Sequence, residues 1–187
     1  MKKEDLIDNL VDDLQEYKPV RPVAQVVGLW FLLLMLGGFS FALFAGAFRE
    51  NIGVQLGSSI RFSLEVVLFL SLSFLLAWRV LGSGVPGYKT KLVSLMAVAA
   101  SISLAGLLSY SVVHPALEVS MAGKRPHCFL ESILVGSLIS FSILVLLRRR
   151  AAFDKLSNGL ISGAAGVLIM AGFMHTACMY DLSLIHI

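Results

Sequence analysis

The chain has 187 residues, of which 57% are hydrophobic and only 14% are charged. Soluble domains carry about 25% charged residues, and a soluble protein of this length has too little interior to hide so much apolar surface. The composition therefore excludes an ordinary soluble domain and predicts an integral membrane protein. The net charge of +3 is small, and its basic residues gather in loops, which is typical of a membrane orientation signal and not of nucleic-acid binding.

The first 22 residues predict a cytoplasmic, acidic tail that contains one short amphipathic helix. Its apolar residues recur at helical spacing, and acidic residues occupy most of the positions between them. The apolar set is Leu6, Ile7, Leu10, Val11 and Leu14. The acidic set is Glu4, Asp5, Asp8, Asp12, Asp13 and Glu16.

This predicted helix needs a partner, because about three turns of helix are only marginally stable alone in water. A membrane surface is a poor partner, since helices that lie on anionic lipid carry Lys and Arg on their polar face. The apolar set, together with Asp5, Asp8, Asp12 and Asp13, is therefore predicted to bind a basic protein surface. Pro19 and Pro22 end the helix and lead into the first apolar stretch.

Five apolar stretches follow, and each is long enough to cross a hydrocarbon core of roughly 30 Å as a helix. The fold class predicted for residues 23–181 is therefore an all-α, polytopic membrane helix bundle. The predicted spans are residues 23–47, 62–81, 92–113, 128–147 and 160–179. In the last span, Gly163, Gly166 and Gly172 are predicted to allow close contact between helices.

The distribution of Lys and Arg predicts the orientation, with the N-terminus in the cytoplasm of a bacterial inner membrane. Eleven basic residues then lie inside and four outside. The inside set is Lys2, Lys3, Lys18, Arg21, Arg79, Lys89, Lys91, Arg148, Arg149, Arg150 and Lys155. The outside set is Arg49, Arg61, Lys124 and Arg125.

The last six residues, LSLIHI (182–187), are expected to be foreign to the protein. They match the translated start of a transposon-end sequencing adapter, and such scars are excluded from fold reasoning. We therefore expect a truncated chain that lacks a sixth helix, and His186 receives no functional role.

With this orientation, several polar residues converge on the outer face. His127 and Cys128 open the fourth span, and Glu131 lies about one turn further along. His175 and Cys178 are three residues apart near the end of the fifth span, and they therefore share one face of a helix. His114 ends the third span, Glu65 begins the second, and Asp181 follows the fifth.

These residues are candidates for sensing a signal, and two chemistries are open. Thiolates and neutral imidazoles bind soft or transition metal ions, so Cys128, Cys178, His127 and His175, with Glu131, are candidate metal ligands. Alternatively, the two cysteines form a disulfide in the oxidising envelope. Each residue alone is also explained by packing. Glu65 and Glu131 are explained either as interfacial caps near helix N-termini or as functional carboxylates inside the membrane.

Two other functional classes require features that this sequence lacks or shows only weakly. A small transporter or channel component needs polar residues near the bilayer midplane. The mid-span polar residues here are serines, which usually serve helix packing. They are Ser71, Ser73, Ser101, Ser103, Ser137 and Ser140. A membrane thiol oxidoreductase normally shows a Cys-x-x-Cys motif, which this sequence lacks. No catalytic residue is predicted, and no cofactor other than a metal ion acting as the signal.

The tail KKEDLIDNLVDDL, the stretch KRPHCFLESILVGSLISFSILVLLRRR and the stretch LSNGLISGAAGVLIMAGFMHTACMYD together resemble the NrsF-like family of negative regulators of extracytoplasmic-function sigma factors. The resemblance covers residues 1–181. It implies a six-helix inner-membrane anti-sigma factor that holds its sigma factor through the N-terminal segment around Leu6 to Leu14. It also implies that Cys128 and Cys178 form the element that responds to stress or metal. The chain departs from the family where LSLIHI replaces the expected sixth helix.

Overall fold

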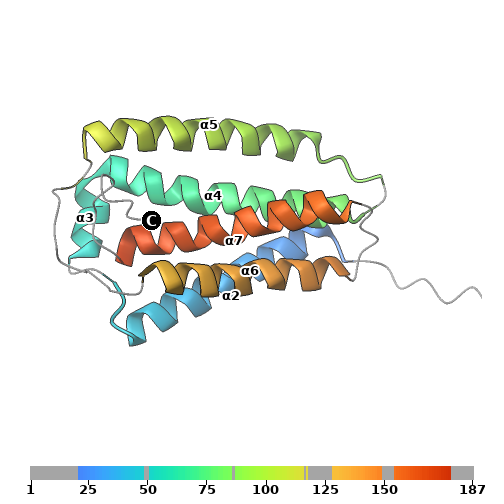
Figure 1. Cartoon of the computed structure of the whole chain (residues 1–187), viewed down its shortest axis with the longest axis horizontal. Helices are drawn as coiled ribbons and strands as arrows, with labels where there is room; N and C mark the ends of the chain where they lie inside the picture. Colours follow the sequence, from blue (N-terminus) through green and yellow to red (C-terminus); the bar gives the residue numbers. More distant parts are fainter. Residues whose placement is uncertain are drawn as a thin grey trace, which may run out of the picture.

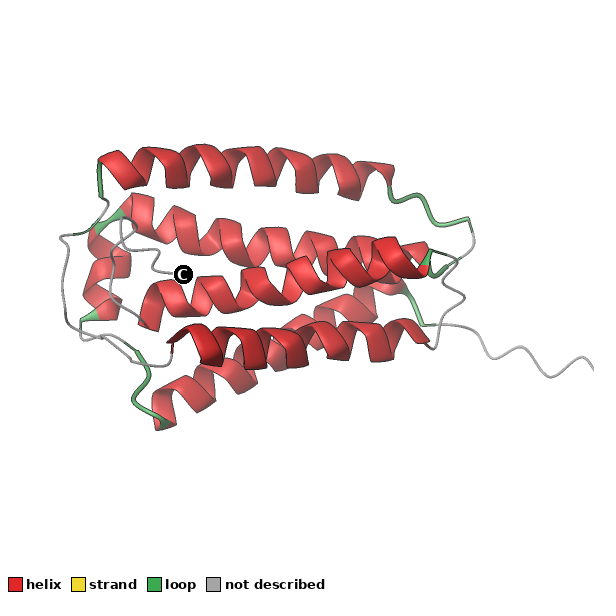
Figure 2. Ribbon diagram, viewed as in Figure 1, coloured by secondary structure: helices red, strands yellow, loops and turns green. Residues whose placement is uncertain are grey.

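The computed structural model describes residues 21–48, 51–85, 87–115, 117, 128–148 and 154–177. In these ranges every regular element is a helix (Figure 2). The helices are α2 (Val23–Phe44), α3 (Ile52–Ser58), α4 (Ile60–Ser83), α5 (Lys91–Val113), α6 (Cys128–Arg148) and α7 (Lys155–Ala177). Five of them are long and apolar enough to span a membrane, with mean hydropathy between 1.6 and 2.2 over their most apolar stretches. The predicted helical membrane bundle is therefore confirmed.

The helix ends follow local capping that the apolar pattern alone does not show. The last helix, α7, begins at Lys155 and not at residue 160, because the Asp154 carboxylate accepts a hydrogen bond from the backbone N–H of Ser157 at 3.1 Å. Ser59 plays the same role for α4, since its hydroxyl accepts from the backbone N–H of Phe62 at 3.4 Å. The Asp and Ser therefore satisfy backbone donors that a helix start leaves open.

The long helices run up and down beside one another, and short α3 lies across one end of the bundle (Figure 1). Helix α4 is central: it packs against α5, α7 and α2, and α6 packs on α7. The start of α2, the end of α4 and the start of α5 lie at one end, at the right in Figure 1. The end of α5, the end of α7 and α3 lie at the other. In the predicted orientation these are the inner and outer ends.

The apolar core of the inner half joins four helices. The buried residues of this core are Val23 and Val27 of α2, Ala77, Val80 and Leu81 of α4, Ile143 and Leu147 of α6, and Ala165 of α7. A second tie is polar: the indole N–H of Trp30 donates to the hydroxyl of Ser142 at 2.9 Å and joins α2 to α6. Buried indole N–H groups usually find such partners.

Small residues let α6 and α7 approach closely, as the sequence predicted for Gly166. A Cβ added there would fall well inside contact distance of Ser140 Oγ and the Gly136 carbonyl. A Cβ on Gly172 would lie 3.2 Å from Phe69 Cβ. Gly163 differs, because a Cβ there would meet open space. The prediction of close contact is therefore confirmed at two of the three glycines.

Two of the mid-span serines join helices, which confirms the packing role expected of them. The Ser73 hydroxyl is buried and donates to the Ala165 carbonyl at 2.7 Å, linking α4 to α7. Ser140 donates to Gly136 of its own helix at 2.7 Å and approaches the Gly163 carbonyl at 3.5 Å. Ser71 and Ser101 each bond the carbonyl four residues earlier in their own helix. All four hydroxyls therefore donate their hydrogen bonds to backbone carbonyls.

Gly166→Ala is expected to destabilise the protein by about 1–3 kcal/mol, because the added methyl group overpacks the α6–α7 contact. The matched control is Gly163→Ala, which adds the same group to the same helix where nothing obstructs it. The control is expected to be neutral or stabilising by up to about 1 kcal/mol, from helix propensity alone. Equilibrium unfolding in mixed micelles measures both, and equal effects would contradict the packing described.

Candidate functional site

The candidate site is built around Glu65, a carboxylate buried inside the membrane-spanning part of α4. Glu65 lies in the second turn of the helix, on the same face as Phe62, Phe69 and Leu72. Its side chain is fully buried. Because burying an unpaired charge costs several kcal/mol, this position requires specific partners. Its burial excludes the interpretation of Glu65 as an exposed interfacial cap.

Two other helices supply those partners. The hydroxyl of Ser111, near the end of α5, donates to Glu65 Oε1. The imidazole of His175, near the end of α7, places Nε2 2.6 Å from Glu65 Oε2. An ionised carboxylate only accepts hydrogen bonds, so Nε2 donates when Glu65 is charged. One carboxylate therefore joins α4 to α5 and to α7.

His175 is itself held in a largely apolar environment. Its side chain is 10% exposed. The imidazole stacks on the ring of Phe62, with centroids 5.1 Å apart and an interplanar angle of 22°. The ring of Phe69 packs at 5.8 Å in a tilted geometry. Both phenylalanines belong to α4, so the orientation of His175 depends on the same helix that carries Glu65.

Arg61 provides the positive charge of the cluster. Its Nη2 donates to Ser111 Oγ at 3.0 Å and also to the backbone carbonyl of His114. Its guanidinium lies 4.8 Å from the centroid of the Tyr110 ring, a cation–π distance. Arg61 Nε is buried and has no hydrogen-bond partner among the described residues. Arg61 thus reaches Glu65 through Ser111, which accepts from the arginine and donates to the carboxylate.

The sequence identified only part of this site. Glu65 and His175 were both candidates, and the structure brings them together. His114 contributes its backbone carbonyl, not its imidazole, to Arg61. Arg61 and Ser111 were missed as site residues. The signal that would have found Arg61 is its spacing of four residues from Glu65, which places a cation and a carboxylate on one helix face.

The remaining predicted residues are only partly described. Glu131 lies in the first turn of α6, where the helix macrodipole favours a carboxylate. Cys128 is the first residue of α6, but its side chain lies outside the described residues, as do His127, Cys178, Asp181 and the whole acidic tail. Within the described ranges no group of three His, Cys, Asp or Glu side chains is arranged to hold a metal ion.

An apolar cavity of about 420 Å³ lies at the outer end, beside the His175 region of α7. Its walls come from α2, α3, α4 and α7, and they include Leu36, Phe39, Val66 and Phe173. Gly172 and Thr176 of α7 also line it. Because the walls are almost entirely apolar, this cavity offers no binding groups for an ion or a polar substrate.

The cluster connects three helices through hydrogen bonds. Its polar groups bond to one another across three helices, and their geometry sets the relative position of those helices. Removing one member of a buried, hydrogen-bonded network leaves its partners unpaired in a low-dielectric interior, which is strongly destabilising.

Comparisons of the chain with models of known protein families, with curated proteins and with solved structures gave no match.

Glu65→Ala is expected to destabilise the protein by about 3–5 kcal/mol, because it leaves the buried groups of Ser111 and His175 without their shared partner. Glu131→Ala is the matched control: it removes a carboxylate that is only partly buried from the same end of the bundle, and a smaller loss is expected because this position costs less to desolvate. Thermal or denaturant unfolding in lipid nanodiscs measures both. Similar losses in the two variants would show that Glu65 has no special role.

Proposed function

We propose that this chain is an inner-membrane anti-sigma factor, which binds an extracytoplasmic-function sigma factor through its acidic N-terminal helix and releases it on an envelope signal. The observation that carries the proposal is that the two ends of the bundle differ. The buried cluster around Glu65 lies at one end, and the tail leads into α2 at the opposite end (Figure 1). A signal at the first end and an output at the second is the arrangement that a transmembrane regulator needs.

The described basic residues support the orientation that this function requires. Six of them lie at the end of the bundle where α2 begins. They are Arg21, Arg79, Lys89, Lys91, Arg148 and Lys155. Arg61 alone among the described Lys and Arg residues lies at the opposite end, and it is bonded within the cluster. This asymmetry favours a cytoplasmic tail under the positive-inside rule.

In this proposal the signal acts on the thiols of Cys128 and Cys178. Cys178 follows α7 directly and is three residues from His175, and Cys128 is the first residue of α6, which packs on α7. Metal binding or oxidation at these cysteines would act on the ends of two packed helices, one of which carries His175. A ligand shifts such an equilibrium only by binding one arrangement more tightly than the other.

In this proposal the sigma factor binds the apolar stripe of the tail. Burying five apolar side chains, at roughly 1.5–3 kcal/mol each before entropy costs, is sufficient for a useful affinity. The acidic residues around the stripe suit a basic surface, such as one that a sigma factor presents to DNA. A small transporter is the weaker alternative, because the serines that were described in mid-span bond to backbone carbonyls and do not line a polar path.

Changing Leu10 and Leu14 together to Asp is expected to abolish sigma-factor binding, because charge then interrupts the apolar stripe. Co-purification from membranes should lose the sigma factor, and a reporter of its regulon should be switched on without any inducer. The expected loss of affinity is about 100-fold or more, from two lost apolar contacts.

The matched control is the double change Asn9→Asp and Gln15→Glu, which adds the same charge outside the stripe. It should leave binding and repression intact. If the Leu10 and Leu14 variant still binds the sigma factor at wild-type strength, the anti-sigma proposal fails.

A further inference from the structure

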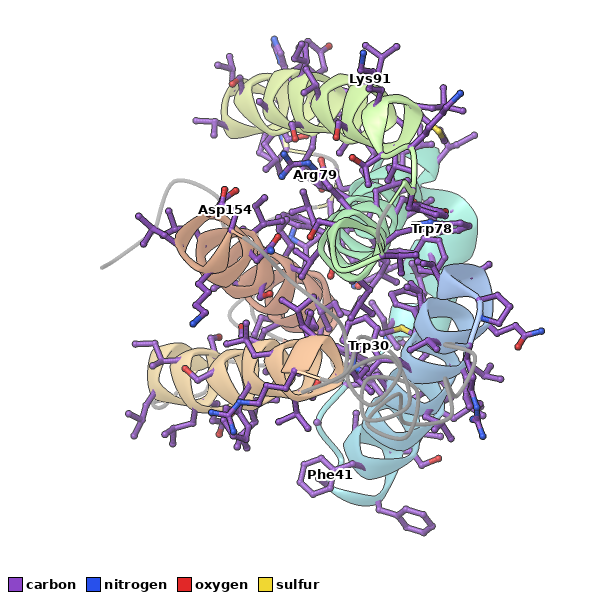
Figure 3. The ribbon with its side chains drawn as sticks, turned by 90° about the vertical axis from the view of Figure 1, so that its right-hand side faces the viewer. Trp30, Phe41, Trp78, Arg79, Lys91 and Asp154 are labelled. Atoms are coloured by element: carbon purple, nitrogen blue, oxygen red, sulfur yellow. The ribbon has the colours of Figure 1, made fainter. Side chains whose placement is uncertain are left out.

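Helix α5 lies at the edge of the bundle, and like α2 it is little buried compared with α4 and α7. It packs chiefly on α4, and an end-on view shows it set apart from α6 and α2 (Figure 3). Only 11% of its most apolar stretch is buried, the same share as for α2, against 33% for α4 and 39% for α7. Its buried residues, Ala97, Leu104 and Ser111, recur every seven residues and form a single narrow stripe. Ala97 and Leu104 of this stripe pack on Phe69 and Leu72 of α4.

Two arginines of α4 hold this helix near its two ends. At the outer end Arg61 bonds Ser111 Oγ and the His114 carbonyl. At the inner end Arg79 Nε donates to Ser94 Oγ at 2.9 Å, and Figure 3 shows Arg79 between α4 and α5. The two arginines are 18 residues apart, which is about five turns, so they project from the same face of α4.

We propose that α5 is a movable helix fastened to α4 by these two arginines, and that release of the outer one moves α5 against a bundle that otherwise stays intact. Its regulatory meaning rests on the proposed function: movement of α5 would carry a change at the outer cluster to the inner end of the bundle. The movement itself depends only on the contacts between α4 and α5.

Arg61, which bonds α5 at the outer end, has a second possible partner within α4 itself. Arg61 and Glu65 are four residues apart, a spacing at which a cation and a carboxylate on one helix meet directly. In the arrangement observed, Arg61 instead reaches across to α5, and its buried Nε has no partner among the described residues. A buried, unsatisfied donor is unusual in a folded protein, so an arrangement that gives Nε a partner competes with the one observed. Turning Arg61 toward Glu65 would satisfy Nε and free Ser111 with the end of α5.

Ser111 connects this fastening to the third helix. It accepts from Arg61 and donates to Glu65, whose other oxygen is bonded to His175 of α7. A displacement of α7 that changes the position of Glu65 therefore changes the hydrogen bond that Ser111 can offer to Arg61. This chain of contacts is a continuous physical route between α7 and α5.

The test measures the separation of α4 and α5 at the outer end. Spin labels are placed on Ile60→Cys and Val113→Cys, two exposed positions, in the full chain with Cys128→Ser and Cys178→Ser, in lipid nanodiscs. Arg61→Gln and Ser111→Ala are each expected to shift the label distance longer by about 2–5 Å, within one helical turn, and to broaden its distribution. A second label pair, on Leu138→Cys of α6 and Val167→Cys of α7, should not change.

Ser101→Ala is the matched control, because Ser101 is exposed and its hydroxyl donates to the Ala97 carbonyl of α5 itself, so its removal breaks no described hydrogen bond to α4. The proposal is overturned if Arg61→Gln and Ser111→Ala leave the first distance unchanged. It is also overturned if both label pairs shift together, since the cluster would then hold the whole bundle and not α5 alone.

These outcomes are separate from those of the proposed function. If α5 moves in Arg61→Gln while the sigma factor remains bound and the regulon silent, the fastening stands and its link to the sigma factor is lost. If tail variants release the sigma factor but α5 never moves, the anti-sigma function stands and the proposed movement of α5 is wrong.

Discussion

A single buried carboxylate accounts for the organisation of the outer half of this protein. Glu65 is fully enclosed, and it is stable there because Ser111 of α5 and His175 of α7 both bond to it. Leaving a charged group in hydrocarbon without partners costs several kcal/mol. The positions of three helices are therefore coupled: any arrangement that separates one of them from Glu65 must provide it with another partner.

The two halves of the bundle are held by different forces. The inner half relies on close apolar packing among α2, α4, α6 and α7, and on the small residues between α6 and α7. Such packing tolerates little displacement. In the middle of the bundle a second apolar cluster of Phe69, Leu72, Ala97 and Leu104 packs α4 on α5. The outer half adds directional bonds from Arg61, Glu65 and His175, and it borders an apolar cavity. Hydrogen-bonded groups exchange partners more readily than a packed core rearranges, so the outer half is where we infer switching.

The sequence predicted the spans well, because hydrophobic length is a strong constraint in a bilayer. It located the convergence of Glu65 and His175 at one end, since their positions in antiparallel spans require it. It did not reveal Arg61 and Ser111 as their partners, because which face of α4 meets α5 depends on packing. The short helix α3 and the start of α7 were also missed, because they depend on turns and caps at Asn51, Ser59 and Asp154 and not on the apolar pattern. The acidic tail and both cysteine side chains lie outside the described residues, so their roles stay predictions.

The most direct test of this account is a double-mutant cycle on Glu65 and His175. The free energy of unfolding would be measured in lipid nanodiscs for Glu65→Ala, His175→Ala and the double variant. If the buried carboxylate couples α4 to α7, the two single losses will not add, and the coupling energy will be about 1–3 kcal/mol. Additive losses, with a coupling energy below about 0.5 kcal/mol, would contradict the claim.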